Sequence, residues 1–209
     1  MQEDIYWALK VSDFMKTAKR NIILASASPR RKELLQRLGL EFDIVPASID
    51  EKQNDHEDAA TYTLRTAMQK ALAVAKNYTD ATVISADTVV VMDEQILGKP
   101  KTMDQAEEML RNLSGREHVV ITSVGIVDQI SGRSISATEQ TLVYFQTLSK
   151  EEIRAYVETG EPMDKAGAYG IQGLGGLFIR RIEGDFYNVV GLPLNKLYQL
   201  LKEIEIRVL

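Results

Sequence analysis

The chain has 209 residues, of which 44% are hydrophobic and 26% charged, and its formal net charge is −5. The acidic balance argues against general nucleic-acid binding, which needs clustered Lys and Arg, and the lack of cysteine excludes disulfides, thiolate metal sites and cysteine nucleophiles. No run of about 18 apolar residues exists and the N-terminus is too charged for a secretory signal, so we expect a cytoplasmic protein without a membrane span.

Apolar runs rich in β-branched residues alternate with helical patterns along the chain, which predicts an α/β protein. We expect an N-terminal extension over 1–20 and one domain over 21–209. In chain order we expect a strand over 21–25, a helix from Pro29 towards Gly39, a strand over 41–45, a helix over 59–77, a strand over 82–92, a helix over 102–113, a hairpin of strands over 119–127 and 134–145, a helix over 149–160, a strand over 177–182 and a helix over 194–204. Hairpins interrupt the alternation, so the sheet should be mixed.

Two of these helices begin with a capping-box pattern, in which Ser or Thr is followed three residues later by Glu or Gln. The pairs are Thr102 with Gln105 and Ser149 with Glu152. We therefore expect each pair to satisfy backbone N–H groups at its helix start by reciprocal hydrogen bonds.

The first candidate site is the turn SASPRR over 26–31, which lies between a strand and a helix start. A helix N-terminus offers free N–H groups and a positive dipole, so it can bind phosphate. Ser26 can donate to phosphate oxygens, and Arg30 and Arg31 can bind them bidentately. The alternative is that Ser28 is only an N-cap and the arginines form a solvated face. The P-loop pattern of many ATPases is absent.

The second candidate is Asp87, a charged residue in the middle of the apolar run TVISADTVVVM over 82–92. A buried carboxylate must be ion-paired, hydrogen-bonded or bound to metal, because an uncompensated charge costs several kcal/mol. Asp87 is therefore either part of a structural salt bridge or a metal ligand or general base. A magnesium site of one or two carboxylates completed by substrate phosphates would suit it.

Two further segments carry candidate ligand groups. Lys99 precedes Pro100, which stiffens the turn, and a lysine there can reach a polyphosphate, although such lysines are also common in exposed turns. The segment over 164–176 is rich in glycine, so its backbone can approach a ligand closely. Within it, Lys165 adds a phosphate-binding charge, and the Gln172 amide can donate and accept at the edge of a pyrimidine. We interpret His56 and His118 as structural or surface residues.

Six motifs resemble, in order, those of the Maf family of nucleotide pyrophosphatases, over roughly residues 21–204. They are LASASPRRKELL (24–35), SADTVVV (85–91), KP (99–100), LSGREH (113–118), GEPMDKAGAYGIQGLGG (160–176) and GDFYNVVGLPL (184–194). Two positions depart from the family pattern, since Gly98 stands where Glu is common and Ser123 where glycine is usual. The extension over 1–20 lies outside the pattern, which leads to the hypothesis that Met15 is the natural start.

The resemblance implies a mixed α/β fold like that of the inosine triphosphatase family, with a long twisted sheet, flanking helices and two lobes around a cleft. It implies hydrolysis of dTTP and UTP, and of modified pyrimidine triphosphates, to monophosphate and pyrophosphate with Mg²⁺, Mn²⁺ or Co²⁺. Asp87 matches the proton acceptor of the family. Further residues match the active cleft, namely Ser26, Arg31, Glu51, Lys70 and Lys99. The positions that match the dTTP and UTP branch are Arg30, Thr88 and Gln172.

The expected mechanism places the phosphates on Ser26, Arg30 and Arg31, with Lys70, Lys99 and Lys165 adding charge. Asp87 and Glu51 share a divalent metal with the phosphates, and Asp87 acts as base or positions the water. Two alternatives stay open, a septum-formation regulator that binds division proteins and a pyrophosphatase for inosine or xanthosine triphosphate. The resemblance implies a homodimer, although no helical seam in the sequence indicates one.

Overall fold

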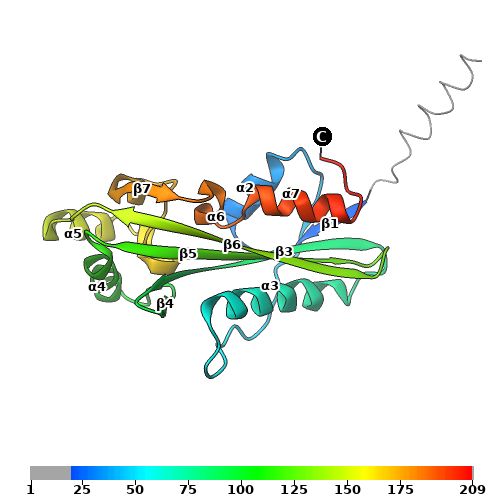
Figure 1. Cartoon of the computed structure of the whole chain (residues 1–209), viewed down its shortest axis with the longest axis horizontal. Helices are drawn as coiled ribbons and strands as arrows, with labels where there is room; N and C mark the ends of the chain where they lie inside the picture. The colour runs from blue at the N-terminus through cyan, green and yellow to red at the C-terminus, as the bar shows by residue number, and fades with distance from the viewer. Residues whose placement is uncertain (1–19, 209) are drawn as a thin grey trace, which may run out of the picture.

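The computed structural model describes residues 20–208, so the extension over 1–19 and the hypothesis about Met15 lie outside the described residues. Seven strands form a single sheet (Figure 1). They are β1 (Asn21–Leu24), β2 (Asp43–Ile44), β3 (Ala81–Met92), β4 (Gln95–Leu97), β5 (Glu117–Asp128), β6 (Arg133–Phe145) and β7 (Ile179–Glu183). The helices are α2 (Pro29–Gln36), α3 (Ala59–Ala75), α4 (Met103–Leu113), α5 (Lys150–Glu158), α6 (Phe186–Val190) and α7 (Leu194–Glu203), with 3₁₀ turns η1 (Glu161–Asp164), η2 (Ala166–Ala168) and η3 (Leu174–Phe178).

The sheet is mixed, as the sequence predicts. Its strand order is β2-β1-β3-β5-β6-β7, and β4 pairs with β3. β1 runs parallel to β2 and β3, whereas all the other pairs are antiparallel. The parallel pairs need helical crossovers, which α2 and α3 supply, and the antiparallel pair β5–β6 needs only a tight turn. Gly132 provides the positive φ of +69° in that turn.

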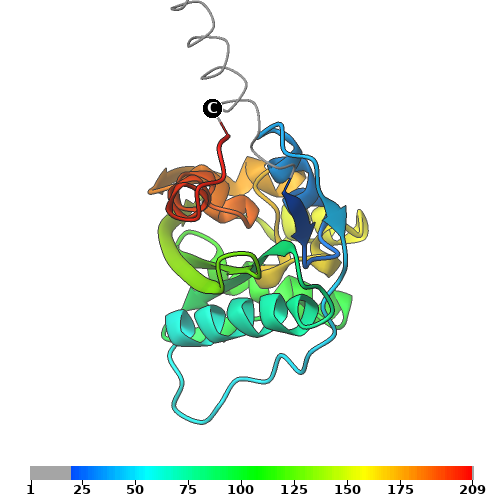
Figure 2. The ribbon, with the colours of Figure 1, turned by 90° about the vertical axis from the view of Figure 1, so that its right-hand side faces the viewer.

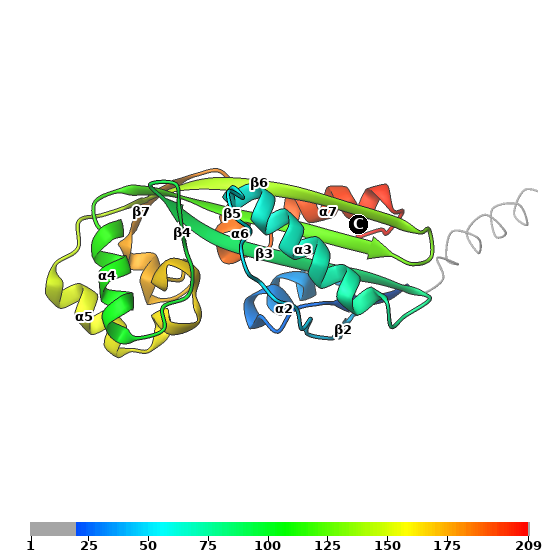
Figure 3. The same ribbon diagram turned by 90° about the horizontal axis from the view of Figure 1, so that it is seen from below.

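The helices form two lobes that the long strands β3, β5 and β6 connect (Figures 1 and 3). In one lobe α3 covers one face of the sheet, and α2 and α7 cover the other (Figure 2). In the other lobe α4 and α5 gather with the 3₁₀ turns at the opposite end of the strands (Figure 3). The expected architecture of a long twisted sheet with flanking helices and two lobes is therefore confirmed.

Each lobe has its own hydrophobic core. In the first lobe, Leu34 of α2, Ile126 of β5 and Leu197 of α7 are fully buried in one cluster. In the second, Leu110 of α4 packs with aromatic rings that include Phe145. Burial of each such side chain stabilises the fold by about 1.5–3 kcal/mol, so both ends of the long strands are held rigid.

The helix α3 lies unusually close to the sheet above Gly125 of β5. A Cβ atom at this glycine would lie 3.1 Å from the backbone of α3 at Ala67 and Met68, and 2.9 Å from the sulfur of Met68. The backbone contacts would be tighter than most real Cβ contacts, so the glycine favours this close packing. It sets the height of α3 above β3 and β5.

The structure corrects several predicted boundaries. The strand expected over 41–45 is only Asp43–Ile44, and the one expected over 177–182 begins at Ile179 because η3 precedes it. Ser149 and Glu152 form the full capping box. Thr102 caps α4, but the Gln105 side chain accepts from the N–H of Lys101 instead of that of Thr102, so this pair is not reciprocal. Within residues 20–208, no helix is long and apolar enough to cross a membrane.

Candidate active site

The site lies at a gap along one edge of β3. β1 pairs with β3 as far as Ile84, and β4 pairs with it from Val90 onwards. Residues 85–89 therefore face a crevice at the carboxyl end of β1, which is where α/β sheets commonly bind ligands. Because successive side chains of a strand point to opposite faces, Asp87 faces α3 and Thr88 faces α2.

The turn after β1 and the start of α2 form one wall of this crevice. Ser28 is the N-cap, and its Oγ accepts a hydrogen bond of 3.5 Å from the N–H of Arg31. The Ser28 N–H donates to Ser26 Oγ at 3.2 Å, which fixes the Ser26 hydroxyl at the helix start. Ser28 is thus an N-cap, as the alternative interpretation held. The free N–H groups and the dipole of α2 still point into the crevice.

Arg31 is held on the floor of the crevice and is not part of a solvated face. Its guanidinium donates to Ser26 Oγ at 3.3 Å, to Thr88 Oγ1 at 3.0 Å and to the carbonyl oxygen of Gly191 at 2.9 Å. Burial lowers the pKa of Arg31 and the charge of Asp87 acts in the opposite direction. An arginine stays protonated in either case, so Arg31 supplies a fixed positive charge.

An ion-paired triad crosses the crevice from α3 to β3. Lys70 Nζ donates to Asp87 Oδ1 and to Glu51 Oε2, each at 2.8 Å. The exposed fractions of the Asp87 and Lys70 side chains are 8% and 11%, whereas that of Glu51 is 48%. Lys70 therefore compensates the buried charge of Asp87, and both carboxylates converge on one point.

These two carboxylates fit a divalent cation that is also bound by phosphate. Their oxygens meet at the same ammonium group, and carboxylate oxygen is the ligand type that Mg²⁺ prefers. Within the described part of the chain, no group of three or more acidic or histidine side chains could hold a metal ion. With Asp87 and Glu51 as carboxylate ligands, phosphate oxygens and water would complete the coordination.

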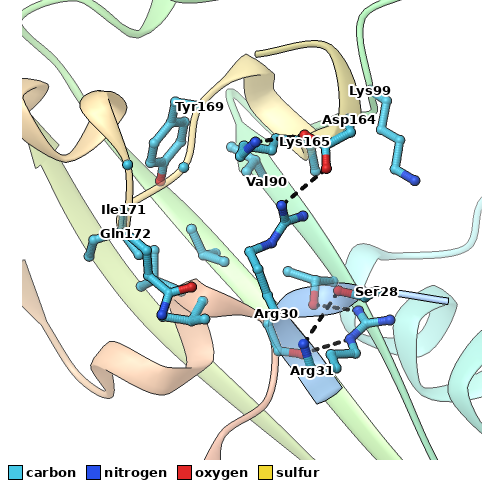
Figure 4. A pocket seen from close by; sticks show the side chains of 18 residues that line it. Ser28, Arg30, Arg31, Val90, Lys99, Asp164, Lys165, Tyr169, Ile171 and Gln172 are labelled. Atoms are coloured by element: carbon cyan, nitrogen blue, oxygen red, sulfur yellow. Dashed lines mark hydrogen bonds and ion pairs between the residues drawn. The ribbon is translucent and has the colours of Figure 1, made fainter. Parts of the chain in front are cut away.

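Two adjoining hollows make up the cleft between the lobes. The first has a volume of about 310 Å³ and is lined by Ser26, Arg31, Glu51, Lys70 and Asp87 among others. The second has a volume of about 100 Å³ and lies beside the glycine-rich segment (Figure 4). Its lining includes Thr88, Lys165, Tyr169, Ile171 and Gln172. The first hollow is strongly charged and the second is flanked by an aromatic ring and an amide, which suits phosphates and a base respectively.

Comparison with known proteins identifies the family. The family of Maf-like proteins matches residues 21–204, which is most of the chain. The chain belongs to the Maf family. A curated protein of Thermoanaerobacter sp. (strain X514), named dTTP/UTP pyrophosphatase, is 46% identical over 190 residues, which are 90% of this chain and 99% of that protein.

Two other relatives of this Maf protein have the same name. The protein of Geobacillus sp. (strain WCH70) is 50% identical over 88% of this chain and 98% of its own length. The protein of Vibrio parahaemolyticus is also 50% identical, over 88% of this chain and 96% of its own. Among solved structures, the Ham1 protein of Staphylococcus aureus superposes with a TM-score of 0.52 at 14% identity, covering 89% of this chain and all of that one. This last likeness concerns the fold alone.

The Maf structure brings the expected site residues together at the cleft. Those that line the first hollow are Ser26, Arg30, Arg31, Glu51, Lys70, Asp87 and Lys99. Those that line the second include Arg30, Thr88, Lys99, Lys165 and Gln172. The histidines lie apart from it, since His56 is in an exposed turn and His118 is buried against Tyr169.

Three polar residues that organise the Maf site were not assigned from the sequence. Glu161 accepts hydrogen bonds from the Tyr156 hydroxyl at 2.9 Å and from the N–H groups of Leu174 and Gly175, so it ties the glycine-rich segment to α5. Asp164 lies at the mouth of both hollows. Asn188 is fully buried, and its amide donates to the carbonyl oxygen of Val120, a residue that lines the second hollow. All three lie in the quoted motifs, which was the available signal, but only the fold shows what they contact.

Proposed function

We propose that this Maf protein hydrolyses dTTP and UTP to the nucleoside monophosphate and pyrophosphate. The observation that carries the proposal is the cleft itself, in which a helix start, buried cations and a buried carboxylate adjoin a hollow flanked by Tyr169 and Gln172. The names of relatives that are 46–50% identical over almost their whole length support it.

In this proposal the first hollow binds the triphosphate. The Ser26 hydroxyl and the N-terminal N–H groups of α2 donate to phosphate oxygens. Arg31, which three hydrogen bonds already orient, needs no rearrangement to bind a phosphate and so contributes with little loss of side-chain entropy. Lys99, which is exposed on the opposite wall, adds a mobile charge (Figure 4).

The chemical step is an attack of water on the α-phosphorus. Asp87 accepts the proton of the water as the new P–O bond forms, and the bond between the α-phosphorus and the bridging oxygen breaks to release pyrophosphate. Lys70 holds the Asp87 carboxylate in place by its 2.8 Å hydrogen bond. A divalent cation, which we propose to be Mg²⁺, Mn²⁺ or Co²⁺, would be held by Asp87 and Glu51 and would neutralise charge on the phosphates.

The second hollow binds the base and distinguishes pyrimidines from purines. Gln172 has an exposed amide on the side of the hollow opposite Lys99, and it can donate and accept at a pyrimidine edge (Figure 4). Thr88 lines the same hollow, and its hydroxyl is held by hydrogen bonds of 3.0 Å with Arg31 and with Thr122.

A substrate panel tests the proposal. The protein is incubated with dTTP, UTP, CTP, ATP, GTP and inosine triphosphate in the presence of Mg²⁺, and pyrophosphate is measured. We expect the highest kcat/KM with dTTP and UTP. A preference for inosine triphosphate would favour the purine enzyme instead, and no release from any nucleotide would favour a binding role in septum formation.

A matched pair of variants tests the catalytic carboxylate. Asp87→Asn should abolish turnover, by a factor of about 10² or more, because an amide cannot accept the proton. Asp80→Asn makes the same chemical change on an exposed loop away from the cleft and should leave kcat unchanged. If Asp87→Asn keeps near wild-type activity on dTTP, Asp87 is not the base.

A further inference from the structure

The two hollows meet at a common rim. Five residues line both of them, namely Ser28, Arg30, Arg31, Lys99 and Asp164. In every nucleotide the sugar joins the base to the phosphates. A nucleotide that places its phosphates in the first hollow and its base in the second must therefore place its sugar at this rim.

Among the five rim side chains, Asp164 is the one carboxylate and therefore the strongest acceptor for a sugar hydroxyl. Arg30, Arg31 and Lys99 are cations with donor hydrogens only. The Oγ of Ser28 already accepts the N-cap hydrogen bond of α2. Asp164 is a carboxylate whose side chain is 62% exposed, so a ligand can reach it.

Two cations keep Asp164 in position and ionised. Arg30 Nη1 donates to its Oδ2 at 3.2 Å, and Lys165 Nζ donates to its Oδ1 at 2.6 Å (Figure 4). Partial burial acts to raise the pKa of Asp164, but the hydrogen bond from Lys165 and the charge of Arg30 outweigh it, and the pKa lies below its ordinary value. The two cations also neutralise the charge of the carboxylate, so it repels a nearby triphosphate only weakly.

We infer that Asp164 accepts a hydrogen bond from the 3′-hydroxyl of the bound nucleotide. This inference rests on the proposed function, because dTTP and UTP share the 3′-hydroxyl whereas only UTP has a 2′-hydroxyl. A contact with the 3′-hydroxyl would serve both nucleotides alike, whereas a contact with the 2′-hydroxyl would serve only UTP. Asp164 is thus a substrate-binding residue that contacts the sugar where it lies between the two hollows.

The test compares dTTP with 2′,3′-dideoxythymidine triphosphate, which lacks only the 3′-hydroxyl. Their Kd values are measured by calorimetry in the presence of EDTA, so that turnover does not interfere. For the wild type we expect the dideoxy nucleotide to bind about tenfold more weakly, since a hydrogen bond to a charged acceptor is lost. For Asp164→Ala we expect the same Kd for both nucleotides.

A matched control separates this contact from a general loss of charge. Glu158 on α5 is a carboxylate with a 64% exposed side chain that pairs with Arg154, remote from the rim. Glu158→Ala should keep the wild-type ratio of the two Kd values. Circular dichroism of each variant verifies that it is folded.

Two results would overturn the inference. If the wild type binds both nucleotides equally, no group recognises the 3′-hydroxyl. If Asp164→Ala weakens both nucleotides by the same factor and keeps their ratio, Asp164 only positions Arg30 and Lys165. Release of pyrophosphate from dTTP by the wild type is measured separately with Mg²⁺, so a failure of the proposed activity is distinguishable from a failure at Asp164.

Discussion

The Lys70→Met variant probes the ion-paired triad that crosses the cleft. The substitution keeps the length of the side chain but leaves the carboxylate of Asp87, which is 8% exposed, without its cation. Breaking a buried pair in this way costs about 3–5 kcal/mol. Glu51 is 48% exposed, and water can replace its contact, so its loss adds less than about 1 kcal/mol. We therefore expect a loss of about 3–6 kcal/mol in the free energy of unfolding.

The assay is thermal and urea-induced unfolding at pH 7 of four proteins, the wild type, Lys70→Met, Asp87→Asn and the double variant. A protein of this size should lose about 6–24 °C in Tm for Lys70→Met. The double variant removes both charges, so it should be more stable than the sum of the single losses implies, with a coupling energy of about 2 kcal/mol. Lys101→Met, on an exposed turn, should change stability by less than about 0.5 kcal/mol. A coupling energy near zero would refute the reasoning that Lys70 compensates Asp87.

Three further predictions concern the base, the metal and a buried histidine. Gln172→Ala should lower kcat/KM for dTTP and UTP by about tenfold while that for ATP stays the same, and an equal loss for all nucleotides would contradict its role. EDTA should abolish pyrophosphate release and added Mg²⁺ or Mn²⁺ should restore it, whereas full activity in EDTA would exclude the metal. Burial lowers the pKa of His118 from 6.5 to about 4. The folded state therefore binds fewer protons than the unfolded state, and this contribution to stability is present above pH 6.5 and is lost as the pH falls towards 4. Compared with His118→Gln, the wild type should lose about 2–3 kcal/mol more between pH 7 and pH 4.5 in urea unfolding. Parallel pH profiles would show that His118 is not responsible.

Much of the fold could be predicted because its local patterns are strong. The run over 82–92 is too apolar and β-branched for anything but a buried strand, and Ser149 with Glu152 is an unambiguous helix start. Other elements depend on tertiary contacts that a sequence does not display. The short helix α6 is capped by Asp185, whose side chain accepts hydrogen bonds from the N–H groups of Tyr187 and Asn188, but its five residues carry too little periodicity to predict a helix.

The site residues divide in the same way, because some could be predicted from local sequence patterns and others depend on tertiary contacts. Asp87 could be singled out because a charge interrupts an apolar strand, whereas its compensating partner Lys70 lies on α3, and only the packing of α3 on β3 brings the two together. Lys165 was expected to bind phosphate, and that role remains a prediction. Its ammonium contacts Asp164 and the carbonyl oxygen of Glu161, a pairing that spacing along the chain does not reveal.

Gly125 lies in the core, yet its lack of a side chain affects the position of a residue in the active site. This residue does not line the cleft, yet α3 rests directly upon it and carries Lys70. A Cβ there would lie 3.1 Å from the α3 backbone, so we expect a larger residue to push α3 outward and, with it, the Lys70 ammonium that pairs with Asp87. Enzyme activity should thus be sensitive to a substitution at Gly125, which contacts neither nucleotide nor metal. A search for inactive variants that is limited to cleft residues would miss this position.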